Sequence, residues 1–151
     1  MSDLPGLPVT FRPTRTRVIM ITAAVAIFAV VTAVGLLLEP IGPGERASFV
    51  LTAALLAGVL LMLSRPRVVA EESGVTVVNL TTRRRLDWAE IVSVNLRPGD
   101  PWVFLNLSDG TSLPALGIQP GIARRRALAD ARALRALVDA RSVAGPGAPR
   151  G

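Results

Sequence analysis

Hydrophobic and polar positions divide the chain into two parts of different character. Two long apolar runs lie in the first part, and short apolar segments separated by turn residues fill the second. Residues 18–38 carry no charge, and residues 47–64 form a second uncharged run. At 1.5 Å of rise per residue the first run is about 32 Å long, enough for a hydrocarbon core of about 30 Å. The pattern therefore predicts two transmembrane helices, the second at the short end of the spanning range.

The segment between the runs, residues 39–46, contains two prolines and two glycines. Such residues end a helix and turn the chain, so the two helices are expected to be antiparallel neighbours. Five arginines flank the hairpin at its other end: Arg12, Arg15, Arg17, Arg65 and Arg67. Because positive residues favour the cytoplasmic side, we expect both termini, including residues 1–17, to be cytoplasmic and residues 39–46 to be external.

A signal peptide followed by a buried helix is the competing interpretation. The first run is longer than a typical signal-peptide core, and Glu39-Pro40 is a poor cleavage context. A core helix would also show a polar face, whereas the first run has only Thr22 and Thr32 as polar residues. We therefore favour two membrane spans.

Small residues recur at four-residue spacing on both predicted helices, as Ala29 with Ala33 and Ala54 with Gly58. This spacing allows two helix backbones to approach closely. An alanine-rich composition is the simpler explanation. If the spacing matters, it predicts packing within one hairpin, with homo-oligomer formation through the helix pair as the weaker alternative.

From residue 65 onward, short apolar segments alternate with turn residues, which is typical of antiparallel strands. About six strands are expected, in residues 68–70, 75–80, 85–88, 91–96, 102–107 and 112–115. Asp109-Gly110 predicts a hairpin turn of type I′, and Pro114 marks its strand as an edge.

Residues 122–142 change to a helical period. The face expected to pack on the sheet is lined by Ala127, Ala131, Leu134 and Val138. Glycine and proline in residues 143–151 predict a flexible tail. Residues 65–142 are therefore expected to form an α+β domain, a strongly curved antiparallel sheet or partial barrel capped by a C-terminal helix.

The amino-acid composition limits the kinds of catalytic and metal-binding site that the chain could form. Cysteine, histidine and lysine are absent, which removes the usual nucleophile, general base and metal ligand. Without a glycine-rich phosphate loop as well, we expect no enzyme, no cofactor and no metal site. Asp100 and Asp109 have ordinary turn roles, and Trp88 and Trp102 are more often core residues than parts of a ligand cleft.

All seventeen basic residues are arginines, and the formal net charge is +6. Arg83, Arg84 and Arg85 are expected at a hairpin turn or its exit, where they could bind lipid phosphates; a solvated turn is the more frequent explanation. Arg124, Arg125 and Arg126 occupy the first turn of the predicted C-terminal helix, where the helix dipole disfavours cations. An anion bound there and an arginine-rich composition explain this cluster equally well.

Several motifs together resemble a bacterial pleckstrin-homology (PH) domain family, in the group named for the low molecular weight protein antigen 6. They are residues 65–80, Leu-Asp-Trp-Ala-Glu-Ile at 86–91, residues 94–102, and the run from Leu107 to Pro120. The resemblance covers residue 8 to about residue 142 and includes the helix pair. It implies a PH-like fold behind two transmembrane helices, with no established chemistry. A full PH fold has seven strands, one more than the pattern predicts.

The expected function is therefore a binding module held at the inner face of the plasma membrane, which engages membrane lipids of anionic type or a partner protein. The alternative is a non-catalytic structural or scaffold subunit of a membrane protein assembly. Binding of nucleic acid is not expected, because the basic residues do not alternate with aromatic ones.

Overall fold

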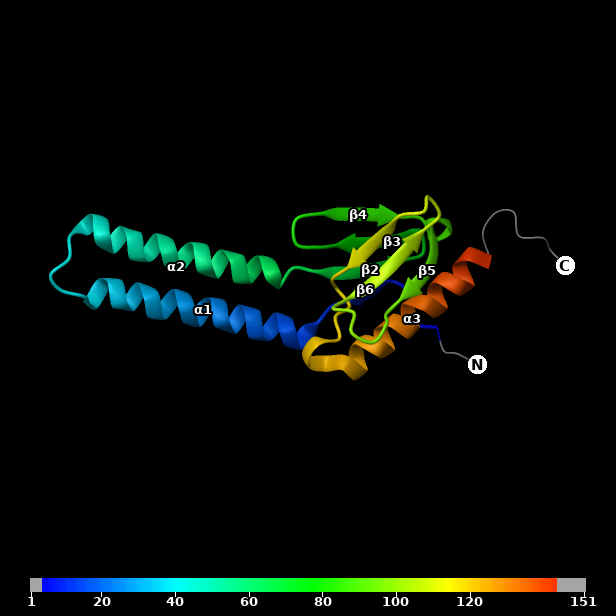
Figure 1. Cartoon of the computed structure of the whole chain (residues 1–151), viewed down its shortest axis with the longest axis horizontal. Coiled ribbons are helices and arrows are strands. Elements are labelled where there is room, and N and C mark those ends of the chain that lie inside the picture. The colour runs from blue at the N-terminus through cyan, green and yellow to red at the C-terminus, as the bar shows by residue number, and fades with distance from the viewer. Residues whose placement is uncertain (1–3, 144–151) are drawn as a thin grey trace. The chain divides into compact units, whose positions relative to one another are not determined.

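The computed structural model describes residues 4–143, which form two units (Figure 1). One unit is a helical hairpin, Thr14–Arg65. The other is a β-rich domain, built from the segment that ends at Pro13 together with the chain from Pro66 onward. The predicted tail lies outside the described residues, apart from Val143.

The hairpin consists of α1 (Thr14–Leu37) and α2 (Pro43–Leu63). Both helices are long and apolar enough to cross a membrane. Pro43 lies in the first turn of α2, where a missing N–H costs no intrahelical hydrogen bond. Most of the large apolar side chains of both helices are exposed within this unit, so its surface resembles one that faces lipid rather than water.

The two helices pack through small residues, as the sequence suggested, but not through the expected pairs. The buried positions are Ala24 and Gly35 of α1 and Ala53 and Ala57 of α2. A Cβ atom added at Gly35 would collide with the side chain of Phe49, which explains the glycine.

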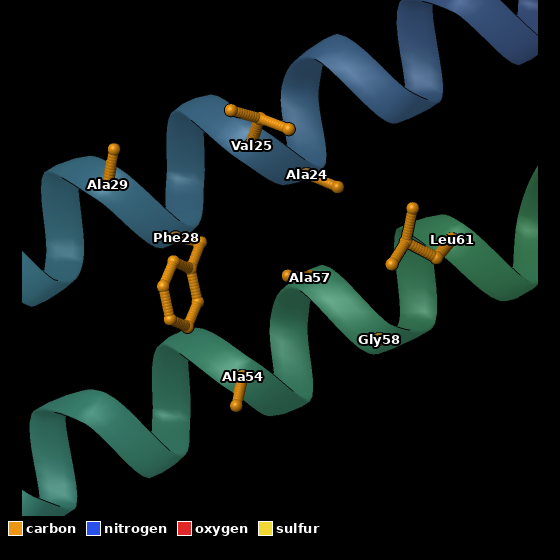
Figure 2. Close-up of a pocket in the computed structure, with 8 residues that line it drawn as sticks. All are labelled: Ala24, Val25, Phe28, Ala29, Ala54, Ala57, Gly58 and Leu61. Atoms are coloured by element: carbon orange, nitrogen blue, oxygen red, sulfur yellow. The ribbon is translucent and has the colours of Figure 1, made fainter.

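The pairs Ala29 with Ala33 and Ala54 with Gly58 are exposed, so the prediction that they pack the hairpin is wrong. Ala29, Ala54 and Gly58 instead border an apolar groove of about 450 Å³ on the flank of the hairpin (Figure 2). Phe28 projects from α1 toward α2 at one part of this groove.

Within residues 4–143, the domain contains seven strands in two antiparallel sheets. The first sheet has the order β1-β2-β3-β4, with β1 (Val9–Phe11), β2 (Arg67–Glu71), β3 (Gly74–Val78) and β4 (Arg83–Leu86). The second has the order β5-β6-β7, with β5 (Ile91–Asn95), β6 (Val103–Leu107) and β7 (Ser112–Ala115). The 3-10 turn η1 (Trp88–Glu90) separates them, and α3 (Arg124–Val143) follows the 3-10 turn η2 (Gly121–Ala123).

The six strands expected after the hairpin are all present, but the single curved sheet or partial barrel is not. Within residues 4–143 no strand pairing joins β4 to β5, so the strands form two sheets. Pro114 lies on β7, at the edge of the second sheet, as predicted.

The seventh strand, β1, precedes the hairpin in sequence. Phe11 pairs with Val68 and Val9 pairs with Ala70, so β1 and β2 form an antiparallel pair. The hairpin is therefore inserted between two paired strands of one sheet. The segment before α1, which is outside the expected domain bounds of residues 65–142, supplies one of the strands of the domain.

Alternate strand residues and one face of α3 form the core, which holds Val68, Val77, Leu86, Leu105 and Leu134 among its fully buried side chains. The four α3 residues predicted to face the sheet are all buried. Trp88 is also in the core, and its Nε1 donates to the carbonyl oxygens of Glu71 (3.0 Å) and Glu72 (3.2 Å).

Asn79 and Gly117 make close contacts between the two sheets and the segments next to them. The side-chain amide of Asn79 donates to the carbonyl of Pro114 (2.8 Å) and accepts from the backbone N–H of Leu116 (3.1 Å). A Cβ atom added at Gly117 would lie 2.6 Å from the Cα atom of Arg67, so only glycine permits the segment after β7 to approach β2.

The turn between β6 and β7 differs from the predicted type I′. That type needs a positive φ at both central residues, whereas among the described residues only Gly110 has one here, at 85°. The Gly110 N–H donates to Leu107 (3.1 Å) and the Leu107 N–H donates to Thr111 (2.8 Å), which closes a three-residue loop.

Replacing Phe11 by alanine should lower the free energy of unfolding of the domain by about 3 kcal/mol, because it removes a core ring. Phe11 is 5% exposed and belongs to the core cluster. Hydrogen exchange of β2 in the full chain measures the effect, and Thr10→Ala on the exposed side of the same strand is the control. Equal exchange in the two variants would contradict the assignment of β1 to the domain.

Arg135 connects α3 to β5 through two hydrogen bonds. Its Nε donates to the carbonyl oxygen of Val94 at 3.1 Å, and its Nη2 donates to the same oxygen at 2.6 Å. Arg135→Ala should cost about 1.5 kcal/mol of domain stability, the usual contribution of a hydrogen bond from a charged donor. Arg132→Ala, an exposed change on the same helix, should cost less than about 0.5 kcal/mol. Chemical denaturation of both variants checks this difference, which should vanish if the contact is incidental.

Candidate functional site

The three arginines of β4 do not form one cluster. They begin β4 directly after the turn, at the turn exit that the sequence allows, and strand residues alternate between the two faces of a sheet. Arg84 pairs with Val77 and shares the face of the buried Leu86, whereas Arg83 and Arg85 lie on the opposite face. The three side chains therefore leave β4 toward two different faces of the sheet.

Two of these arginines have acidic partners. Arg85 approaches Glu71 with 3.5 Å between Nη1 and Oε2 and also donates to the hydroxyl of Ser73. Arg84 lies 4.0 Å from Asp109, between Nη2 and Oδ2. Hydrogen bonds from Thr111 lower the pKa of Asp109, and Arg84 lowers it further. Both pairs are exposed, so each contributes little to stability.

The other arginine cluster lies where the sequence predicts it. Arg124, Arg125 and Arg126 are the first residues of α3, all three are exposed, and the first turn has no acidic residue. The pKa of Asp130, one turn later, is raised above its ordinary value because the carboxyl group is partly buried. The positive charge of Arg126 offsets part of this rise. The start of α3 is thus an exposed cationic surface.

Arg97, which the sequence pattern did not single out, joins this surface. It lies in the loop between β5 and β6 and lines the same small hollow as Arg124. The volume of the hollow is about 90 Å³, and its lining is Leu96, Arg97, Pro98, Gly99, Asp100, Pro120, Arg124 and Leu128. We call it the Arg97–Arg124 hollow. No sequence pattern around this isolated arginine predicts that it lies near Arg124. Its place in the hollow depends on how α3 packs on the domain.

Asp100 holds the loop in shape. Its Oδ2 accepts from the backbone N–H of Arg97 (2.8 Å), and its own N–H donates to the carbonyl of Arg97 (3.0 Å). Gly99 has a φ of 93°, which the tight turn requires. Asp100 and Asp109 therefore both have the turn roles that the sequence predicts.

A second hollow of about 220 Å³ lies over the outer side of the second sheet. It is lined by Asn95, Arg97, Asp100, Phe104, Asn106 and Ser112. The hydroxyl of Ser93 accepts from the side-chain amides of Asn106 (3.0 Å) and Asn95 (3.3 Å). Trp102 lies beside Phe104 with ring centroids 6.4 Å apart and is outside the buried core cluster, so the expectation of a core position is wrong for this tryptophan.

Comparison with known proteins places these features in a family. A family model described as a bacterial PH domain matches residues 65–137. Uncharacterized proteins of Mycobacterium tuberculosis and Mycobacterium bovis are 32% identical to the chain over 136 residues, which covers 86% of this chain and 88% of theirs. No solved structure matches the chain. The two sheets, the terminal helix and these matches agree, and the chain belongs to the bacterial PH domain family.

Proposed function

We propose that the protein is a PH-like binding module, anchored at the inner face of the plasma membrane, that engages anionic lipid. The insertion of the hairpin between β1 and β2 carries this proposal. Only residues 12–13 join β1 to α1, and only residues 64–66 join α2 to β2. A chain reaches at most about 3.5 Å per residue, so linkers this short keep the domain at the membrane surface.

The same connectivity supports the orientation. Because β1 and β2 belong to one domain, both connected ends of the hairpin must lie on one side of the membrane. The five arginines next to these ends favour the cytoplasmic side. Each arginine close to an anionic leaflet gains about 1 kcal/mol, so this orientation also favours contact with anionic lipid.

The charges of the domain point to the same ligand class. Within residues 4–143 only Arg84 and Arg85 form ion pairs, so the guanidinium groups of Arg97, Arg124 and Arg125 have no acidic partner within 4.0 Å. Guanidinium groups bind phosphate through paired charge-assisted hydrogen bonds. With neither histidine nor cysteine in the chain, binding is better supported than catalysis.

A structural subunit of a membrane protein assembly is the second candidate. The groove on the hairpin favours it, since Ala29, Ala54 and Gly58 leave room for a further apolar helix. Purification of the tagged chain from native membranes in mild detergent separates the two: a partner retained at fixed stoichiometry supports the structural role.

Reconstitution tests lipid engagement directly. The full chain is placed in nanodiscs of neutral phosphatidylcholine or with increasing phosphatidylglycerol, and hydrogen exchange of residues 121–126 is followed at low and high salt. We expect anionic lipid to slow exchange and salt to reverse the effect. Arg124→Ala with Arg125→Ala should remove about 2 kcal/mol of this protection.

The matched control is Arg132→Ala with Arg141→Ala, which removes the same charge from later in α3. It should keep the protection. If neutral and anionic nanodiscs give equal exchange in the unaltered protein, lipid engagement is wrong, and a partner protein becomes the better proposal.

A further inference from the structure

We infer that the Arg97–Arg124 hollow binds a single phosphate monoester group. This inference rests on the proposed function, because it names the chemical group that the domain would recognise at an anionic membrane. Arg97 comes from the β5–β6 loop and Arg124 from the start of α3, and packing of the domain brings both residues to the lining of one hollow. Arginines from two separate segments can approach the same phosphate from different directions.

Charge in the hollow favours an anion. Two arginines and one carboxylate line it, so their formal sum is +1. The Asp100 carboxylate accepts a hydrogen bond from the loop backbone and forms no ion pair with either arginine within 4.0 Å among the described residues. The donors of Arg97 and Arg124 are thus available to a ligand, and Asp100 both shapes the loop and opposes the anion.

The remaining lining strengthens this preference. Leu96, Pro98, Pro120 and Leu128 supply apolar walls beside the charged groups. Such walls lower the local dielectric constant, which strengthens hydrogen bonds between guanidinium and phosphate. The start of α3 adds a partial positive charge, and its first turn has no acidic residue to cancel it.

The size of the hollow suits one compact group of a ligand. A volume of about 90 Å³ corresponds to about three water molecules at their liquid density. One phosphate group fits this space. A monoester is preferred over a diester, because it carries a second negative charge at neutral pH and has three terminal oxygens for two guanidinium groups.

The test uses the full chain and compares free and lipid-borne phosphate. In neutral phosphatidylcholine nanodiscs, inorganic phosphate is titrated at constant ionic strength and hydrogen exchange is followed in residues 96–101 and 121–126. A second arm replaces part of the lipid with phosphatidic acid, a monoester, or with phosphatidylglycerol, a diester. We expect both segments to be protected by a monoester, and the arm that protects them identifies its source.

Three variants make the test specific. Arg97→Ala with Arg124→Ala should weaken the response at least about tenfold, because it removes both charged donors. Asp100→Asn keeps an acceptor for the Arg97 N–H and removes the opposing charge, so it should bind phosphate about threefold tighter or more. Arg132→Ala with Arg141→Ala, the same charge change elsewhere, should respond as the unaltered chain does.

Two results would overturn the inference. One is the absence of monoester protection in both arms, and the other is an equal response in the Arg97 and Arg124 double variant. If phosphatidylglycerol still slows exchange at residues 121–126 while no monoester does so at residues 96–101, the phosphate site is wrong and the proposed engagement of anionic membranes stands.

Discussion

The pairing of β1 with β2 is the interaction on which the other features depend. It joins residues before and after the hairpin, through the pairs Val9 with Ala70 and Phe11 with Val68. The pairing covers one edge of β2, whose backbone groups would otherwise need another partner, and it places the Phe11 ring in the core. It also connects both ends of the helical hairpin to one folded unit.

The fold of the domain determines which arginines form the candidate site. The domain is joined to the hairpin by two short linkers, residues 12–13 and residues 64–66. Residues that are adjacent in sequence do not by themselves define the candidate site. The three arginines of β4 point to two faces of the sheet. Arg97 and Arg124, which are distant in sequence, line one hollow because α3 packs on the domain. The candidate site is therefore a property of the assembled domain, shaped by the Asp100 turn and by the anchoring of α3 on β5.

Strong local signals made much of the fold predictable. Uncharged runs located both helices, alternation located β2 to β7, and the helical period identified the buried face of α3. The sequence did not predict features that depend on contacts between distant residues. One is β1, which has only three residues between two prolines and pairs with a strand that follows the hairpin. For the same reason the small-residue spacing indicated the wrong face of α2, and Arg97 had no signal at all. The separation into two sheets, with the η1 turn between β4 and β5, likewise has no signal in the strand composition.

Disulfide trapping in membranes tests the β1–β2 pairing most directly, because the chain has no cysteine of its own. Thr10 pairs with Val69, so Thr10→Cys with Val69→Cys should form a disulfide. After cleavage at a protease site placed in the loop between α1 and α2, the two pieces should stay joined until reduced. Thr10→Cys with Arg83→Cys, which lie three strands apart in the sheet and therefore more than about 14 Å from each other, should not bridge. Failure of the first pair to bridge, or equal bridging of both, would contradict the insertion of the hairpin between paired strands.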